Sequence, residues 1–234
     1  MQKFVFTLLF SLLMMPTQAQ PLTRELRDYC QSLQAEFAQI DASRQETLQA
    51  LAQYIRTQRQ AGQVVNLTFI CTHNSRRSQL GQVWAKVASL YVGFADAEVQ
   101  TYSGGTSASA CNPRTVAALQ CAGVPVAVLS DNQNPENPTY EVRLGEGLQP
   151  FILFSKRYDD AFNPQTAYGV VLVCSQADET CPIVRGAAVR IYHGYEDPKR
   201  ADGTAEEQAT YDATCRLIAR EVLYAFTLAA QTNE

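Results

Sequence analysis

The segment Asn66-Leu-Thr-Phe-Ile-Cys71-Thr-His-Asn-Ser-Arg-Arg77-Ser78-Gln-Leu80 decides how this chain is organised. The apolar run Val64 to Ile70, which overlaps its start, has the length and β-branched content of a buried strand. From Leu80 onward, apolar residues recur at i, i+3, i+4, i+7 and i+11, which is a helical spacing. The segment therefore predicts a strand, a tight loop and a helix. A cysteine stands where the strand ends, and an arginine stands six residues later.

That geometry has chemical consequences. A loop that enters a helix N-terminus turns its backbone N–H groups into one concavity, which binds anions. A cysteine at the rim of such a loop loses its proton easily and becomes a nucleophile. Arg77 can hold two oxygens of a tetrahedral anion, and Ser78 can donate a hydrogen bond to the sulfur. We expect a Cys71 thiolate that reacts with a tetrahedral oxyanion such as phosphate or arsenate. The residues expected to bind the oxyanion are Thr72, His73, Asn74, Ser75, Arg76 and Arg77.

Composition bounds the class of protein. The 234 residues suffice for one large domain or for one domain with substantial additions, and a charged content of 18% is ordinary for a globular protein. The net charge of −4 gives no electrostatic basis for nucleic acid as a partner. His73 and His193 are the only histidines, so we expect no metal site, and no cofactor is expected.

The N-terminus predicts an export signal. Lys3 gives a basic start, Phe4 to Met15 is almost wholly apolar, and Thr17 and Ala19 fit the −3 and −1 positions of a cleavage site. The alternative, a membrane anchor, needs roughly 18–20 apolar residues, and this run is shorter. We expect residues 1–19 to be a signal peptide and the mature protein to be periplasmic and free of the membrane. The seven cysteines, an odd number, leave a thiol unpaired in a compartment where disulfides persist.

The rest of the chain alternates strands and helices. This predicts an α/β fold with three layers, α/β/α, around a mostly parallel central sheet in residues 63–234. Residues 20–62 predict an N-terminal extension of two helices, which either covers the main domain or docks a partner; we favour the cover. Near 130–160, the runs Tyr140–Leu144 and Gln149–Phe154 predict an inserted β-hairpin.

Two helices have distinct sequence signals. Asn112-Pro113 opens one of them, and Cys121 is expected on its apolar side. The last helix is expected to begin at Thr204, with Glu207 completing a capping box.

A second cysteine ends a strand. The apolar run from Tyr168 closes at Cys174, and ligands of parallel sheets bind at the carboxyl ends of strands, so Cys71 and Cys174 could share one site. Cys181 follows one loop later. The pair Cys174 and Cys181 could form a structural disulfide, or Cys181 could resolve a Cys71–Cys174 disulfide by thiolate exchange.

A thiolate that attacks phosphorus or arsenic also needs an acid that protonates the leaving oxygen. The segment Tyr195-Glu-Asp-Pro198 offers two carboxylates. Asp197, held by the proline after it, is better placed than its competitor Glu196.

The stretch Phe69-Ile-Cys71-Thr-His-Asn-Ser-Arg-Arg77-Ser-Gln79 resembles the active-site loop of the low-molecular-weight protein tyrosine phosphatases. It is most similar to that of their relatives, the thioredoxin-coupled arsenate reductases. The resemblance covers roughly Leu67 to Phe226 and implies that family's fold for residues 63–234. The other segments that match in family order are Tyr102-Ser-Gly-Gly-Thr106, Asn112-Pro113, Cys174 to Pro182, and Asp197 before its proline.

The chain departs from the family pattern at three positions. Arg76 stands where the reductases often carry another cysteine, and His73 stands where glycine is common. Gln82 aligns with an acidic residue that helps to form a potassium site in some members, so no potassium site is expected.

The resemblance implies two mechanisms. In the reductase, Cys71 attacks arsenate, Cys174 attacks Cys71 to expel arsenite, and Cys181 attacks Cys174. A thioredoxin-like donor then reduces the Cys174–Cys181 disulfide. In the phosphatase, Cys71 takes a phosphoryl group from a phosphorylated substrate, and Asp197 protonates the leaving alcohol and later activates water. We favour the reductase, although reductant is scarce outside the cytosol. The alternatives are the phosphatase and a non-catalytic oxyanion-binding or thiol-redox protein.

Overall fold

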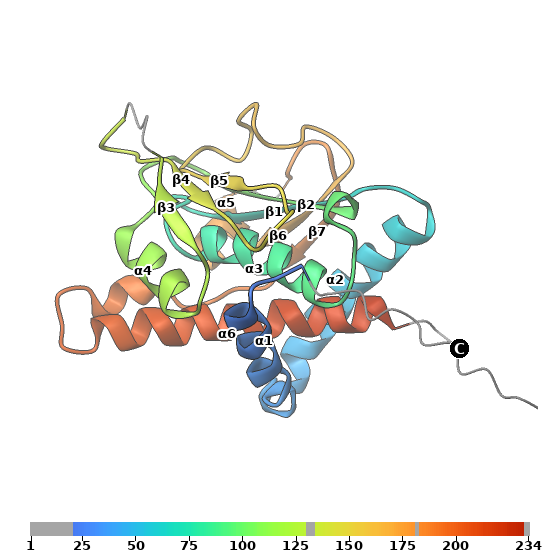
Figure 1. Ribbon diagram of the computed structural model, residues 1–234. Coiled ribbons are helices and arrows are strands. Elements are labelled where there is room, and N and C mark those ends of the chain that lie inside the picture. Colours follow the sequence, from blue (N-terminus) through green and yellow to red (C-terminus); the bar gives the residue numbers. More distant parts are fainter. Residues whose placement is uncertain (1–20, 130–133, 181–182, 232–234) are drawn as a thin grey trace, which may run out of the picture.

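The computed structural model describes residues 21–129, 134–180 and 183–231 (Figure 1). The expected signal peptide, residues 1–19, lies outside these ranges. Among the described helices, none combines the length and apolar character needed to cross a membrane. The α-helices are α1 Arg24–Gln34, α2 Ala42–Gln60, α3 Arg77–Tyr91, α4 Pro113–Cys121, α5 Ser175–Thr180 and α6 Glu207–Ala230. The 3-10 helices are η1 Phe37–Gln39, η2 Asp96–Glu98 and η3 Pro198–Ala201. The strands are β1 Val65–Cys71, β2 Val99–Gly105, β3 Val126–Val128, β4 Tyr140–Val142, β5 Phe151–Leu153, β6 Tyr168–Leu172 and β7 Ala187–Tyr192.

The central sheet is parallel and has helices on both sides, which confirms the predicted fold class. Its strand order is β2-β1-β6-β7. β1 lies inside the sheet, where Cys71 pairs with Gly105 of β2 and Ile70 pairs with Leu172 of β6. Since all these strands run in one direction, their carboxyl ends meet at one edge of the sheet. Cys71 therefore lies at the ligand-binding edge.

Helix α3 follows the site loop and packs closely on β1. Gly81 of α3 lies against the Phe69 ring, where an added Cβ would come within 2.4 Å of a ring carbon. A larger residue at this position would push the helix away from the strand. Close contact between α3 and β1 fixes the loop that joins them.

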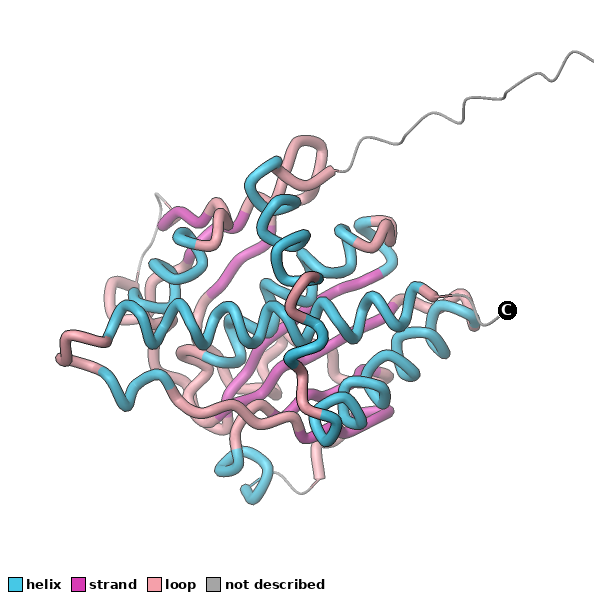
Figure 2. Tube along the Cα trace, turned by 90° about the horizontal axis from the view of Figure 1, so that it is seen from below, coloured by secondary structure: helices cyan, strands magenta, loops and turns pink. Residues whose placement is uncertain are grey.

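Helix α6 is the central helix of the helical layer, and α1, α2, α3 and α4 all pack on it (Figure 2). Its apolar stripe is buried as the sequence predicts: Tyr211, Cys215, Ile218, Val222 and Phe226. The expected start at Thr204 is wrong, since α6 begins at Glu207. The Thr204 hydroxyl donates to the carbonyl of Ala201 and accepts from the Glu206 amide, so Thr204 closes a turn before the helix. The Glu207 carboxylate accepts from the Gly203 amide instead of capping Thr204.

The predicted β-hairpin is present as β4 and β5, which pair antiparallel. β3 also pairs antiparallel with β4, so this region forms a separate sheet of three strands among the described residues. The start of the described chain packs on this sheet: the Thr23 amide donates to the Leu144 carbonyl at 3.0 Å. Gly145 allows the approach, because a Cβ there would lie 1.8 Å from the Pro21 oxygen.

The two helices expected in residues 20–62 are α1 and α2. One hydrophobic core runs through them and the central sheet, including Leu26 and Ile55 from these helices and Leu67 from β1. The Tyr54 ring lies over Gly169 of β6, and its hydroxyl donates to the Asn66 carbonyl at 3.2 Å. Because the core is continuous, the division of the chain at residue 62 stays a prediction.

Helix α4 opens at Asn112-Pro113 as expected, and the Asn112 side chain accepts from the Arg114 amide at 2.9 Å. The expectation that Cys121 belongs to its apolar side is wrong, because Cys121 is exposed. The buried residues of this helix are Thr115, Val116, Ala118 and Leu119, and Ala122 directly after the helix is buried as well. Cys121 lies between the buried positions and faces solvent.

Candidate active site

Cys71 is the last residue of β1 and is 3% exposed. Its Sγ lies 3.0 Å from the Ser78 Oγ, in the first turn of α3. The Ser78 Oγ accepts a hydrogen bond from the Asn74 Nδ2 at 2.9 Å, so its own proton is free to point to the sulfur. A hydrogen bond donated to a thiolate stabilises the charged form. Ser78 is therefore placed to donate to the sulfur, and its role in catalysis stays a prediction.

Asn74 holds the loop in shape. Its backbone φ is +46°, a left-handed conformation that asparagine tolerates better than most residues. Its Oδ1 accepts from the Lys156 amide at 2.9 Å. Gly105 lies beside it: a Cβ there would come 2.8 Å from the Asn74 nitrogen and 2.1 Å from the Ser107 oxygen. The loop is therefore fixed by the neighbouring strand as well as by its own side chains.

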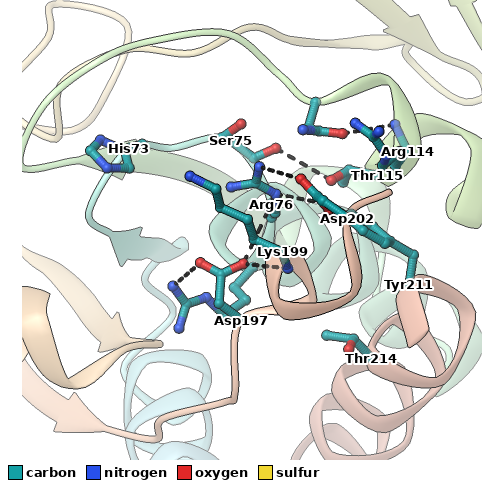
Figure 3. Close-up of polar contacts among 12 residues, drawn as sticks. His73, Ser75, Arg76, Arg114, Thr115, Asp197, Lys199, Asp202, Tyr211 and Thr214 are labelled. Atoms are coloured by element: carbon teal, nitrogen blue, oxygen red, sulfur yellow. Dashed lines mark hydrogen bonds and ion pairs between the residues drawn. The ribbon is translucent and has the colours of Figure 1, made fainter. Parts of the chain in front are cut away.

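A pocket of about 120 Å³ opens above Cys71. It is lined by Cys71, Thr72, His73, Ser75, Arg76, Arg77, Gln176, Asp197 and Lys199. Four of these side chains are basic and one is a carboxylate, so the pocket suits an anion. Its volume suits a small tetrahedral oxyanion or a phosphoryl group. His73 is one of the lining residues (Figure 3). Its Nδ1 is 2.9 Å from the Ser107 Oγ.

Arg77 points toward residues 194–197, the loop between β7 and η3 that carries Asp197 and is called the acid loop below. Its Nη2 donates to the Asp197 Oδ2 at 2.6 Å, and its Nη1 donates to the Tyr195 carbonyl at 2.8 Å. Its Nε is buried and has no hydrogen-bond partner among the described residues. An unpartnered buried N–H is costly. Through its two other nitrogens, Arg77 ties the start of α3 to Asp197 and Tyr195.

Asp197 enters the pocket from the N-cap of η3. Its Oδ1 accepts from the Lys199 amide at 3.1 Å and lies 3.9 Å from the Arg76 Nε (Figure 3). Its competitor Glu196 is 74% exposed and pairs with Arg200. The structure thus places Asp197, and not Glu196, at the wall above Cys71.

Arg76, the residue before Arg77, is held by contacts with two other segments. Its Nε donates to the Tyr211 hydroxyl at 2.8 Å, and its Nη2 lies 3.7 Å from the Asp202 Oδ2 (Figure 3). Tyr211 also donates to Asp202 at 2.8 Å. These contacts tie the site loop to α6.

Cys174 lies two residues beyond β6 and is buried. The Thr72 Oγ1 is 3.5 Å from its Sγ and donates to the Gln176 Oε1 at 3.0 Å. Since the Thr72 hydroxyl has one proton, which goes to Gln176, the Cys174 thiol donates to Thr72. The Ala177 amide also points to the sulfur, at 3.4 Å. The structure thus brings Cys174 to the residue next to Cys71. Cys181 lies outside the described residues.

The remaining described cysteines are not part of this pocket. Burial raises the pKa of the Cys30, Cys111 and Cys215 thiols to about 12. Cys215 also accepts from the Trp84 Nε1 at 3.2 Å. These three thiols lie in the core, as the sequence predicts for Cys215.

Gln176 and Lys199 line the pocket although the sequence does not predict them as site residues, and the contact of Thr72 with Cys174 is also not predicted. The sequence carries one weak signal for each of the two residues. Gln176 lies within the cysteine motif that starts at Cys174, and Lys199 is two residues after Asp197. Neither signal says which way the side chain points, which depends on how α5 and η3 turn at the sheet edge.

Comparison with known proteins gives a consistent set of relatives. No family model matches the chain. An arsenate reductase of Bacillus subtilis is 31% identical over 140 residues, which are 60% of this chain and 78% of the relative. Arsenate reductase 2 of Staphylococcus epidermidis is 28% identical over 130 residues, covering 56% of this chain and 76% of the relative. An arsenate reductase of Halalkalibacterium halodurans is 29% identical over 140 residues, which are 60% of this chain and 78% of the relative.

Solved structures resemble the chain more loosely. A YwlE mutant from Bacillus subtilis has a TM-score of 0.45 at 16% identity and covers 70% of this chain and 98% of its own. An arsenate reductase in the oxidised state has a TM-score of 0.41 at 17% identity, with coverage of 70% and 98%.

Proposed function

Because this chain belongs to the arsenate reductase family, we propose that it reduces arsenate at Cys71 and passes the oxidation to Cys174 and then to Cys181. The proposal depends on one observation: Cys71, at the end of β1, and Cys174, just after the neighbouring strand β6, lie at the same edge of the sheet. Cys71 lies in an anion-binding loop, and Cys174 reaches that loop from the neighbouring strand through the Thr72 hydroxyl. A nucleophilic thiol next to a second thiol is what a reduction by disulfide formation needs.

The first step forms a sulfur–arsenic bond. The Cys71 thiolate attacks arsenate, an As–O bond breaks, and the leaving oxygen departs as water after it takes up protons. Asp197, the carboxyl group that lines the pocket, supplies a proton. Arg77 and the loop amides hold the remaining oxygens.

The second step reduces arsenic. The Cys174 thiolate attacks the Cys71 sulfur, a disulfide forms, and the sulfur–arsenic electron pair stays on arsenic, which leaves as arsenite. Two thiols have then lost two electrons, and As(V) has become As(III). Cys181 attacks Cys174, frees Cys71, and leaves a Cys174–Cys181 disulfide.

An external dithiol must reduce that disulfide before the next turnover. We infer a thioredoxin-like donor, which supplies two electrons and two protons. If residues 1–19 direct export, as the sequence predicts, the donor must also act in the periplasm. Export of the chain and the identity of its donor are both part of the proposal.

The test is steady-state arsenate reduction with a thioredoxin system as donor. We expect Cys71→Ser to remove turnover and Cys174→Ser to remove turnover with this donor. Cys121→Ser is the matched control, because Cys121 is an exposed thiol outside the pocket, and it should keep wild-type activity. Full arsenate turnover by Cys174→Ser would refute the relay. Any turnover by Cys71→Ser would refute the site itself.

A second function is favoured by the position of Asp197. A carboxyl group facing the pocket of a nucleophilic thiolate can protonate the alcohol that leaves a phosphate monoester, and can then activate water. The second candidate is therefore a phosphatase with Cys71 as nucleophile and Asp197 as acid. It predicts hydrolysis of aryl phosphates that Cys174→Ser retains and Asp197→Asn loses. Absence of aryl phosphate hydrolysis by the wild type would exclude it.

A further inference from the structure

Arg44 of α2 reaches the loop that carries Asp197, although it lies more than 150 residues away in sequence. Its Nη1 donates to the Gly194 carbonyl at 3.2 Å. Its guanidinium carbon lies 5.0 Å from the centre of the Tyr195 ring, within the range of a cation–π contact. Gly194 and Tyr195 come just before Asp197, so Arg44 contacts the base of the acid loop.

Arg44 is itself held rigidly. Its Nε and Nη2 donate to the two carboxylate oxygens of Glu221, at 2.6 and 2.7 Å, a bidentate geometry that fixes the plane of the guanidinium. Glu221 comes from α6, and its side chain is 1% exposed. His193 completes the cluster: its Nε2 lies 2.9 Å from Glu221, and its Nδ1 contacts the Thr47 hydroxyl. Helix α6, through Glu221, and the residue that follows β7, His193, therefore both contact Arg44 of α2.

The contact continues from the acid loop into the active site. The Tyr195 carbonyl accepts from the Arg77 Nη1, and the same guanidinium donates to Asp197. The Tyr195 ring packs edge-on against His193, with ring centres 5.2 Å apart. Displacing residues 194–195 would therefore move Asp197 and also the Tyr195 carbonyl that accepts from Arg77.

We propose that Arg44 is a positioning residue: the N-terminal helical extension holds residues 194–197 so that Asp197 faces Cys71. The extension is then more than a cover, because it supplies one side of the support for the acid. The inference rests on the proposed role of Asp197 as an acid. A merely structural Arg44 would stabilise the protein without any particular effect on proton donation.

The first readout does not depend on activity. We would compare amide hydrogen exchange of the peptide covering residues 193–199 in the wild type and in Arg44→Met. We expect exchange about tenfold faster in that peptide, with no change in the Cys71 loop. The matched control is Arg56→Met, another arginine of α2, which donates to the Leu228 carbonyl of α6 and to the Gln53 side chain within α2. It should leave residues 193–199 unchanged.

The second readout isolates proton donation. Phenyl phosphate has a poor leaving group that needs an acid, whereas 2,4-dinitrophenyl phosphate has a good leaving group that does not. We expect Arg44→Met to lower kcat for phenyl phosphate by roughly 10- to 100-fold and to change kcat for the dinitrophenyl ester by less than about threefold. Asp197→Asn should show the same pattern, and combining the two changes should add little.

Removing Arg44 alone leaves Glu221 buried without its cation, and the variant could unfold for that reason. The double variant Arg44→Met/Glu221→Leu replaces the ion pair with an apolar pair and should fold while losing the contact to Gly194. Unchanged exchange in residues 193–199 of the folded variants, or an equal fall in kcat for both esters, overturns the inference. If the wild type cleaves neither ester, the phosphatase proposal fails, and the exchange result alone decides whether Arg44 holds the loop.

Discussion

The buried carboxylate of Glu221 predicts a pH dependence of stability. Burial alone would raise its pKa, but hydrogen bonds from Arg44 and His193 outweigh burial and lower the pKa from 4.5 to about 2. A carboxyl whose pKa is lower in the folded protein contributes stability above its unfolded value of 4.5. That contribution falls as the pH drops from 4.5 toward 2.

The magnitude follows from the two pKa values. The shift from 4.5 to about 2 corresponds to about 3 kcal/mol in full. At pH 3.5 the unfolded carboxyl is already mostly protonated while the folded one is still ionised, and about 1 kcal/mol is lost relative to pH 6.5. Glu221→Gln cannot titrate at this position, so its free energy of unfolding should fall by about 1 kcal/mol less than that of the wild type over this range.

Urea unfolding at pH 6.5 and at pH 3.5 measures the difference, provided that the m-values agree. The matched control is Glu196→Gln, because Glu196 is an exposed carboxylate in the same region. It should lose as much stability as the wild type. If the wild type and Glu221→Gln lose the same free energy of unfolding between pH 6.5 and pH 3.5, the pKa of Glu221 is not lowered in the folded protein, and the reasoning is refuted.

Three further predictions follow from the site and the cysteines. Ser78→Ala should lower kcat roughly 10- to 100-fold, because it removes the donor 3.0 Å from the Cys71 sulfur, and an unchanged kcat would contradict this. Gly105→Ala should cost about 1–3 kcal/mol in the free energy of unfolding and impair turnover, since its Cβ would overlap the loop at Asn74; wild-type stability would refute it. Iodoacetamide at pH 8 should alkylate Cys121 in the folded protein and spare Cys111, whose pKa burial raises to about 12; peptide mass spectrometry would reveal labelling of Cys111 as the contrary result.

The strand, loop and helix around Cys71 could be predicted because each depends on local signals. The apolar run, the polar loop and the spacing from Leu80 are all visible within one short segment. The same holds for the buried stripe of α6. The start of α6 could not be placed, because Thr204 offers a capping residue that the chain uses for a preceding turn instead.

Contacts between segments that are far apart in the chain could not be predicted from the sequence. The pairing of β3 with β4 depends on which sheet edge the chain meets, and short apolar runs carry no such information. The support of the acid loop by Arg44 and Glu221 joins residues 177 positions apart. A glutamate inside the apolar stripe of a helix is a visible oddity, but its partner is known only once α2 and α6 are packed together.

The central claim is that Cys71 reduces arsenate by passing its oxidation to Cys174 and Cys181. A single-turnover experiment tests it most directly: fully reduced protein is mixed with excess arsenate and no donor, and both arsenite and disulfides are measured. We expect about one arsenite per protein, together with a Cys174–Cys181 disulfide found by peptide mapping. In Cys181→Ser the disulfide should instead join Cys71 to Cys174. Release of no arsenite, or release of arsenite with Cys174 still reduced, would contradict it.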